Sequence, residues 1–440
     1  MLKRVRRSIR ASIAAGLGFV LLAACGVGAT PVDNPKLSKG KVTLTMNWWG
    51  ADARIQQTMK AIKLFEAEHP NIEVKPQFSD WSGYWDRLAT TTAAGDMPDV
   101  TQFEQAYLAS YADRGALLDL STVKKYLKTS AYPDDLLESG RVNGKLYGLP
   151  TGGTTNAVLV NTTLFKKYGI DLPDTDRWTW KDFERASVAL SKASDGKVHG
   201  VLPFGSDAFS LTVWARQHGK ELYNDDGELI LDVKTLASYW QRELDLINSS
   251  AAPSVAELTE SLNLPLDQSS IATGKVGTAF ISAGQFTAFQ QTAPKYKYAL
   301  ATWPTDPDTT SHFQYLKPAM HWSAASTTRH PAEAALLINF LANDTRVAKI
   351  FGLERGEPGN PAFLKAVQSV VTKDDRKVLD FSAKTSDQVG KTPPITPNGA
   401  SDIALLMSRY NQQVLFKDAT PEQAASAFIR ELGDSIRAAR

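Results

Sequence analysis

Tryptophan is the residue type whose placement in this sequence most directly indicates a chemistry. The chain has 10 Trp, and Trp48 and Trp49 follow a segment of strand character. An indole stacks well on the flat C–H face of a sugar ring, whose hydroxyls then need a few placed polar partners. Since successive strand residues point to opposite sides, we expect at least one of the pair to face a binding cleft. Trp49 is favoured because it lies farther along the strand; the alternative places both in the core.

Motifs of the common catalytic classes are missing. The sequence has no Gly-x-Ser-x-Gly, His-Glu-x-x-His, P-loop or dinucleotide-binding fingerprint. A single cysteine and six scattered histidines disfavour a zinc site, so we expect no metal and no cofactor. The acidic run 225–228 fits a calcium loop or a hairpin turn, and the Asp226-Gly227 pair favours the turn. These patterns favour a binding protein over an enzyme.

The elements that must position Trp48 and Trp49 alternate between strand and helix. In order they are a strand over 42–47, a helix with Ile55, Met59, Ile62 and Phe65 on one face, a strand with Ile72, Val74 and Phe78, a helix with Trp81, Tyr84, Trp85 and Leu88, and a strand after Pro98. Such a β-α-β-α-β run predicts a parallel sheet. Ligands of open parallel sheets bind outside the carboxyl ends of the strands, where Trp48 and Trp49 lie.

The first 25 residues have the pattern of a processing segment. Basic residues from Lys3 to Arg10 precede an apolar run, Ile9 to Leu22, that is too short for a comfortable membrane span. The run ends in Leu22-Ala23-Ala24-Cys25, which has the pattern of a lipobox, so cleavage after residue 24 would free Cys25 for lipidation. The alternative is an ordinary signal peptide that happens to contain a cysteine. Residues 25–40 are predicted to be a flexible tether.

The net charge and the number of cysteines bear on two questions: whether the protein binds nucleic acid, and whether disulfides stabilise it. The whole chain carries a net charge of +2, but residues 25–440 carry −3, so the basic character belongs to the signal segment. Binding of nucleic acid therefore loses its main support. A lone cysteine rules out an intramolecular disulfide, so a large apolar core must hold the fold. The mature length predicts two or three domains.

Seven short segments match one known family in their order and spacing. They are Trp48-Trp49-Gly50, Phe65-Glu66 with 69–74, 94–100, 144–150, 161–165, 178–180 and 354–360. Through these segments, which span nearly the whole mature chain, the sequence resembles the family 1 extracellular solute-binding proteins. Members of that family are oligosaccharide receptors of ABC importers.

The resemblance implies an α/β fold of two lobes, joined by hinge crossings, with the ligand in a cleft between them. We expect the N-terminal lobe to contain residues 41–151 and 303–352, and the C-terminal lobe residues 152–302 and 353–440. The glycines of 150–154 and the bend at Pro304 suit the crossings. The implied function is a monomeric receptor, anchored by lipid to the extracytoplasmic face of the cell membrane. It would deliver an oligosaccharide to the transmembrane subunits of an ABC permease.

The resemblance also implies site residues. Its ligand-facing positions fall on Phe103, Glu104, Gln105, Asp207, Phe209, Phe286, Trp303, Trp322 and Arg355. By contrast, Trp85, Trp178, Trp180 and Trp240 lie on helical faces and are expected to be packing residues. Independently of the family, Arg54 is a cation at a helix start, where the dipole disfavours it. This suggests a ligand or a carboxylate partner for Arg54, with a solvated surface arginine as the alternative.

Two other function classes stay open. A secreted glycoside hydrolase would also use tryptophans and would need two carboxylates about 5 to 9.5 Å apart. Asp80 with Asp86, or Glu104 with Asp207, are the available pairs, although nothing in their context selects them. The other class is a surface adhesion or signalling module without transport. The sequence does not identify the sugar, its length or its linkage.

Overall fold

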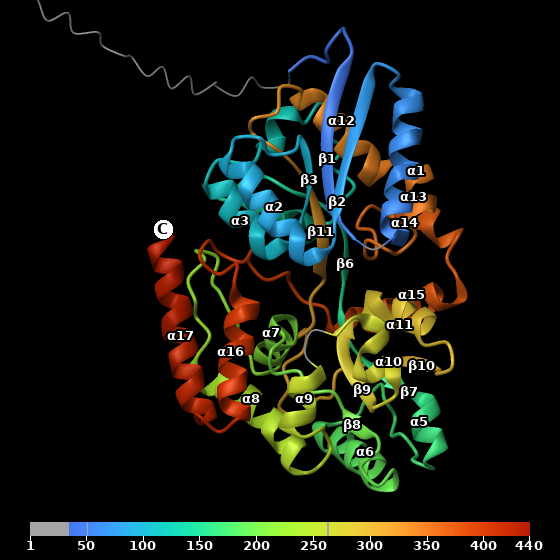
Figure 1. Cartoon of the computed structure of the whole chain (residues 1–440), viewed down its shortest axis with the longest axis vertical. Helices are drawn as coiled ribbons and strands as arrows, with labels where there is room; N and C mark the ends of the chain where they lie inside the picture. Colours follow the sequence, from blue (N-terminus) through green and yellow to red (C-terminus); the bar gives the residue numbers. More distant parts are fainter. Residues whose placement is uncertain (1–34, 51, 262–263) are drawn as a thin grey trace, which may run out of the picture.

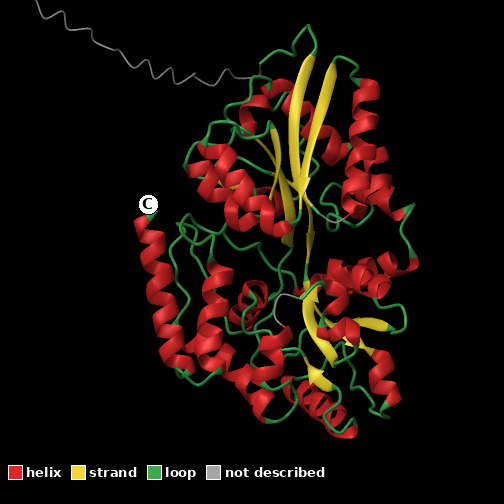
Figure 2. Cartoon of the chain, in the orientation of Figure 1, coloured by secondary structure: helices red, strands yellow, loops and turns green. Residues whose placement is uncertain are grey.

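The structure is a computed structural model that describes residues 35–50, 52–261 and 264–440. The predicted signal peptide 1–24, Cys25 and the tether up to residue 34 lie outside the described residues. Two lobes are stacked along the long axis of the molecule, each with a sheet at its centre and helices around it (Figures 1 and 2). The predicted two-lobed α/β fold is confirmed. Within the described residues, no helix is both long enough and apolar enough to span a bilayer.

The first lobe is organised by a five-stranded sheet. Its order is β2 (Ile72–Ser79), β1 (Val42–Trp49), β3 (Val100–Phe103), β11 (Lys317–Ala324) and β6 (Leu149–Thr154). As the β-α-β-α-β pattern predicts, β1 pairs in parallel with both β2 and β3. The antiparallel β11 then joins β3 to β6 and so completes the sheet. The helices of this lobe are α1 (Asp52–Glu68), α2 (Trp81–Ala93), α3 (Gln105–Asp113), α4 (Asp134–Glu138), α12 (Pro331–Asn343), α13 (Thr345–Phe351) and α14 (Pro361–Gln368).

The second lobe contains a four-stranded sheet. Its order is β10 (Tyr298–Ala301), β7 (Asn156–Asn161), β9 (Val276–Ser282) and β8 (His199–Val201). Its helices are α5 (Thr162–Lys167), α6 (Trp180–Ala193), α7 (Ala208–Gln217), α8 (Val233–Asn248), α9 (Val255–Ser261), α10 (Ser270–Thr273), α11 (Phe286–Thr292), α15 (Lys373–Lys384), α16 (Ile403–Leu415) and α17 (Pro421–Ala438). Trp178, Trp180 and Trp240 are buried in its core, which confirms that they are packing residues.

Local signals in the sequence produce the expected local structure. Asn143 and Gly144 both have positive φ and join β4 (Arg141–Val142) to β5 (Lys145–Leu146) as a two-residue hairpin. The predicted capping box at Thr179 opens α6, with the side chain of Asp182 returning to the Thr179 N–H. The acidic run 225–228 forms a turn in which Gly227 has φ +70°. Among the described residues, no three His, Cys, Asp or Glu side chains are grouped to hold a metal ion.

All three lobe boundaries differ from those expected, the first by only three residues because β6 continues to Thr154. Residues 303–316 stay with the second lobe, because Trp303, Phe313 and Tyr315 are part of its core. The return crossing is therefore at the start of β11 and not at 303. Helix α14 packs against α12 and α13 of the first lobe, whereas α15 packs against α11 and β10 of the second. We accordingly assign residues 41–154 and 317–368 to the first lobe, and 155–316 and 369–440 to the second.

A buried carboxyl group holds the loop that leads into α7. Glu243 on α8 is 1% exposed, and its Oε1 accepts a hydrogen bond of 2.9 Å from the Gly205 N–H. Two neighbours on α8 bind the same loop: Trp240 Nε1 donates to the Gly205 carbonyl at 2.9 Å, and the Tyr239 hydroxyl donates to the Phe204 carbonyl at 2.6 Å. Burial raises the pKa of Glu243 to about 7, against the opposing hydrogen bonds from Gly205 and Asn411. The protonated form is therefore the one that the fold favours.

This arrangement predicts a pH dependence of stability that Glu243→Gln removes. Because the folded-state pKa is raised above the ordinary 4.5, the stabilising contribution is complete below pH 4.5 and is lost as the pH rises to about 7. Relative to Glu243→Gln, the wild type should lose about 3 kcal/mol of unfolding free energy over this window. Urea unfolding at pH 4.5 and pH 8 measures it, with the exposed Glu73→Gln as control. Equal pH slopes for wild type and Glu243→Gln would contradict the assignment.

Candidate functional site

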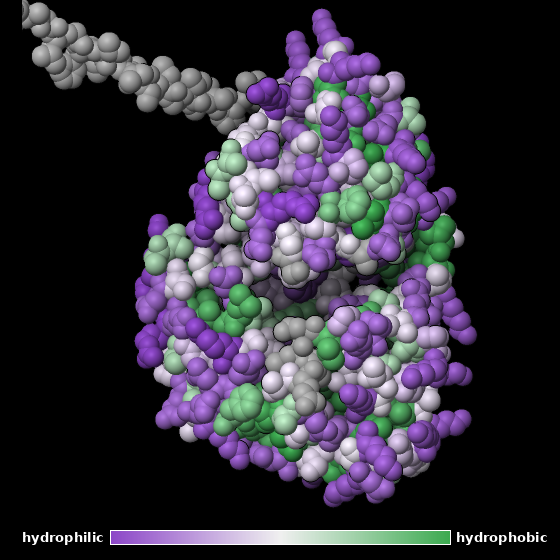
Figure 3. Space-filling view, viewed as in Figure 1, coloured by the Kyte–Doolittle hydropathy of each residue, from purple (hydrophilic) through white to green (hydrophobic). Residues whose placement is uncertain are grey.

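The candidate site is a pocket between the two lobes, with a volume of about 110 Å³. We call it the cleft pocket; it is lined by Glu104, Gln105, Ala106, Ala208, Phe209, Thr212, Leu222, Tyr223, Tyr315, Lys317, Pro393, Pro394, Thr396 and Ile403. The first three come from the end of β3 and the start of α3, and most of the others come from the second lobe. Figure 3 shows the hollow that separates the lobes. Of the predicted site residues, the structure thus brings Glu104, Gln105 and Phe209 together.

An ion pair supplies the charges of the cleft pocket. Lys317 Nζ lies 3.0 Å from Glu104 Oε1, and both side chains are about one-fifth exposed, at 25% and 18%. The other Glu104 oxygen accepts a hydrogen bond of 2.6 Å from the Ala106 N–H and so caps α3. Burial alone would raise the pKa of Glu104, but Lys317 and the Ala106 N–H outweigh it and the pKa is lowered. The pair is therefore ionised and balanced, and it presents both an anion and a cation to a ligand.

Aromatic side chains of the second lobe form the opposite wall. The rings of Phe209 and Tyr315 meet edge to face with centroids 5.2 Å apart. Burial, with the nearby carboxylates of Asp207 and Glu104, raises the pKa of Tyr315. The hydroxyl of Tyr223 is buried and has no hydrogen-bond partner among the described residues. Because this oxygen has almost no accessible surface, it is not available to a ligand in this structure. Asp207 is exposed, and its carboxylate caps α7 by accepting from the Ser210 N–H at 2.7 Å.

Beside the cleft pocket, the end of β1, α2 and α3 together carry a group of rings that we call the aromatic ledge: Trp49, Trp81, Trp85 and Tyr107. Trp85 and Tyr107 are stacked, with centroids 3.8 Å apart and planes at 16°. Trp49 contacts Trp81 and Trp85 with centroids 5.1 and 5.7 Å away. Trp81 is 47% exposed, whereas Trp49 is only 9% exposed. The pairing of Trp49 with Ser79 in parallel strands explains why Trp81, two residues later, lies beside Trp49.

Five of the aromatic residues expected to touch the ligand are core residues instead. Trp48, Phe103, Phe286 and Trp322 are 0% exposed and Trp303 is 1% exposed. Without accessible surface, none of them can contact a ligand in this structure. Trp303 Nε1 donates to the buried Asn156 side chain at 2.9 Å, and this internal bond satisfies its polar atom. Of the first pair, Trp49 therefore lies nearer the cleft, at the edge of the aromatic ledge.

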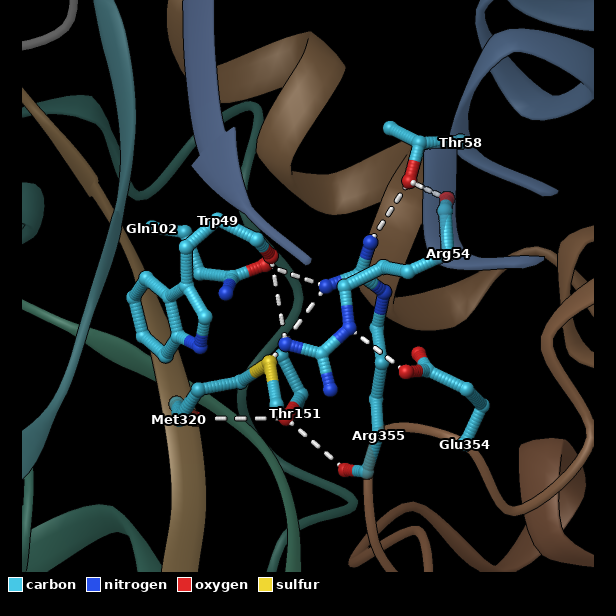
Figure 4. A network of polar contacts seen from close by, with 8 residues as sticks. All are labelled: Trp49, Arg54, Thr58, Gln102, Thr151, Met320, Glu354 and Arg355. Atoms are coloured by element: carbon cyan, nitrogen blue, oxygen red, sulfur yellow. Dashed lines mark hydrogen bonds and ion pairs between the residues drawn. The ribbon is translucent and has the colours of Figure 1, made fainter. Parts of the chain in front are cut away.

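Arg54 and Arg355, both predicted as site residues, bind other residues of the protein instead (Figure 4). Arg355 is 3% exposed, and its guanidinium donates to Thr58 Oγ1 at 2.6 Å and to the side chain of Gln102. It also lies 4.9 Å from the centroid of the Trp322 ring. Burial lowers the pKa of Arg355, against the attraction of Glu354. Arg54 has the carboxylate partner that its position suggested, because its Nε lies 2.5 Å from Glu354 Oε1.

Sequence reasoning missed Trp81, Tyr107, Tyr223, Tyr315 and Lys317. Trp81 had a usable signal, since it is the first residue of a helix that follows a strand parallel to β1. From the sequence alone, Trp81 is placed on the same helix as Tyr84 and Trp85 but is assigned no ligand contact. Lys317 and Tyr315 reach the site through the crossing into β11, more than a hundred residues from Glu104 in sequence. No local pattern indicates that pairing.

Comparisons with known proteins agree with this architecture. Residues 51–346 match the family model of the bacterial extracellular solute-binding proteins. The maltodextrin-binding protein MdxE of Bacillus subtilis is 25% identical over 405 residues, covering 87% of this chain and 88% of its own. A family 1 extracellular solute-binding protein from Alicyclobacillus acidocaldarius is 28% identical with a TM-score of 0.67, covering 91% of this chain and 100% of its own.

A second solved structure, a periplasmic solute-binding protein from Pectobacterium atrosepticum, superimposes with a TM-score of 0.80 at 20% identity. It covers 91% of this chain and 100% of its own, so it shows the shared fold. The matched family model spans about two thirds of the sequence and includes every strand of the two large sheets except β1. The chain belongs to the bacterial extracellular solute-binding protein family.

Proposed function

We propose that this protein captures an oligosaccharide in the interlobe cleft and delivers it to an ABC permease, as a monomeric receptor held at the membrane by a lipid. The observation that carries the proposal is the pairing of the aromatic ledge with the cleft pocket. The exposed ring of Trp81 offers a stacking surface for a sugar face, while Glu104 and Lys317 offer polar partners for sugar hydroxyls. The maltodextrin-binding relative supports a sugar as the solute.

The ionisation of Glu104 and the hydrogen bond of Asp207 to α7 support binding without hydrolysis. Glu104 is held ionised by Lys317 and the helix start, so it is poorly suited to act as a general acid. Asp207 is engaged as the cap of α7. A hydrolase would need one carboxyl with a raised pKa facing a second carboxylate across the scissile bond. We therefore expect a bound oligosaccharide to be recovered intact, which chromatography of the ligand after long incubation checks.

Trp81 should carry much of the binding. A thermal-shift screen with malto-, cello-, manno-, chito- and arabino-oligosaccharides would identify a ligand, and calorimetric titration would then compare variants. Stacking on an exposed indole contributes about 1 to 3 kcal/mol, so Trp81→Ala should weaken binding roughly five- to a hundredfold with little change in melting temperature. Phe416→Ala, which removes an exposed ring remote from the aromatic ledge, is the matched control.

Trp48→Ala should affect the stability of the fold, whereas Trp81→Ala should affect ligand affinity. Because Trp48 is fully buried, its truncation should lower the free energy of unfolding by about 3 to 5 kcal/mol, measured by urea denaturation. If Trp81→Ala binds the selected sugar as tightly as wild type, the aromatic ledge is not the binding surface. If no oligosaccharide of the screen stabilises the protein, the sugar-binding proposal itself fails.

The lipid anchor rests on Cys25, the chain's only cysteine, which follows Leu22-Ala23-Ala24. Cys25→Ser should remove the attachment point and shift the protein from the membrane fraction to the soluble fraction. Fractionation with immunoblotting measures this, and metabolic labelling with a fatty acid should label only the wild type. A serine variant that stays in the membrane fraction with unchanged mobility would argue for a different anchor. A Ser38→Ala variant, which leaves the lipobox intact, serves as the control.

A further inference from the structure

A proline-rich segment of the second lobe crosses the space between the lobes. We call residues 391–400, in the loop between α15 and α16, the proline strap (Figure 1). Pro393, Pro394 and Pro397 fix φ and leave three positions without an N–H, which stiffens the segment. The strap therefore behaves as a fixed part of the cleft and not as a pliable loop.

Both ends of the proline strap are held by the second lobe. At its start, the Gly390 N–H donates to the Gln314 carbonyl at 2.8 Å, and the Gln314 N–H donates to the Gln388 carbonyl at 2.9 Å. At its end, Asn398 Nδ2 donates to the Ala439 carbonyl at 3.2 Å, and Ala400 is fully buried. These bonds tie the strap to the β11 crossing on one side and to the end of α17 on the other.

The middle of the strap reaches the first lobe. Ile395 packs against an apolar cluster that includes Leu108, Ala109 and Val142. Pro393 and Pro394 line the cleft pocket on one side. The same two prolines, with Ile395, also line a separate gap of about 1210 Å³ between the lobes. The strap therefore stands as a partition between the cleft pocket and this gap.

The two sides of the partition differ in chemistry. The cleft pocket has the rings of Phe209, Tyr223 and Tyr315, and the aromatic ledge adjoins it through Tyr107. The described residues that line the gap include no aromatic side chain; they are mainly charged, glycine or proline residues, such as Arg114, Arg141 and Asp225. The stacking surfaces thus end where the strap begins.

We propose that the proline strap closes one end of the binding cleft, so that a single terminal ring of the oligosaccharide sits in the cleft pocket. The chain then extends in the opposite direction only, over the aromatic ledge towards solvent. This inference rests on the proposed function and specifies how the ligand binds: the protein contacts one terminal sugar residue of the chain, and the other terminus stays in solvent. Pro393, Pro394 and Thr396 are the residues that set this limit.

The test uses the full-length protein and the tetrasaccharide of the screen that binds most tightly. Three forms of it are titrated by calorimetry: the free sugar, its p-nitrophenyl glycoside at the reducing end, and its 4,6-O-ethylidene derivative at the non-reducing end. The wild type should bind one blocked form at least tenfold more weakly than the free sugar, and the other within threefold. Equal affinities for both blocked forms, or tenfold losses for both, would overturn the inference.

A variant of the strap links the effect to its prolines. Pro393→Gly/Pro394→Gly should reduce the tenfold loss for the disfavoured form to threefold or less. Pro173→Gly/Pro307→Gly changes two prolines of the second lobe outside the cleft pocket and should keep the wild-type loss. An unchanged loss in the strap variant would overturn the role of the strap. If the strap variant does not fold, the affinities of the wild type for the two blocked sugars test the inference by themselves. If no free sugar binds the wild type, the proposed function is refuted.

Discussion

The close approach of two backbones at the crossing between the lobes is the constraint on which the rest of the structure depends. The N–H of Gly153 donates to the Glu357 carbonyl at 2.8 Å, and the Glu357 N–H returns a bond of 2.9 Å. A Cβ on Gly152 would lie 2.5 Å from the Glu357 carbonyl oxygen, so only glycine fits at that position. Strand β6 thereby leaves the first lobe in a fixed direction, which sets how the two walls of the cleft face each other.

The buried guanidinium of Arg355 connects this crossing to the strand that ends at the cleft pocket. Arg355, two residues before Glu357, holds the side chain of Gln102 and accepts from the Thr151 hydroxyl through its carbonyl at 3.0 Å. Removing a guanidinium from water is costly, and the surrounding hydrogen bonds and rings offset that cost. Because Gln102 is on β3, Arg355 also fixes the strand end that presents Glu104 to Lys317. The predicted ligand contact is thus a support for the residues that do line the cleft pocket.

The sequence was informative where the structure is local. Helical periodicity, the Asn143-Gly144 turn and the capping box at Thr179 each depend on neighbours within a few residues, and all of them are present. The burial of Trp48 and Trp303 depends on which distant elements pack over them, and no neighbouring residue in the sequence indicates this. When helices cover both faces of a sheet, residues on both sides of a strand are buried, so alternation along the strand does not show which residue faces a ligand. The boundary at 303 was misplaced for the same reason, since only the partners of β10 and β11 show which lobe each joins. The family resemblance supplied the fold and the solute-binding role, whereas the lining of the cleft pocket required coordinates.

The return of β11 to the first lobe has a consequence for how the chain folds. Pairing of Phe103 with His321 joins residues that are far apart in sequence, and β11 lies between β3 and β6 in the sheet. Until residue 324 is available, β3 is paired on one side only, with β1, and β6 has no partner in this sheet, so each leaves an unpaired edge. The first lobe is therefore not a separate N-terminal folding unit. Pairings between residues so far apart in sequence form slowly, so most of the chain must be synthesised before the first-lobe wall of the cleft takes its final form.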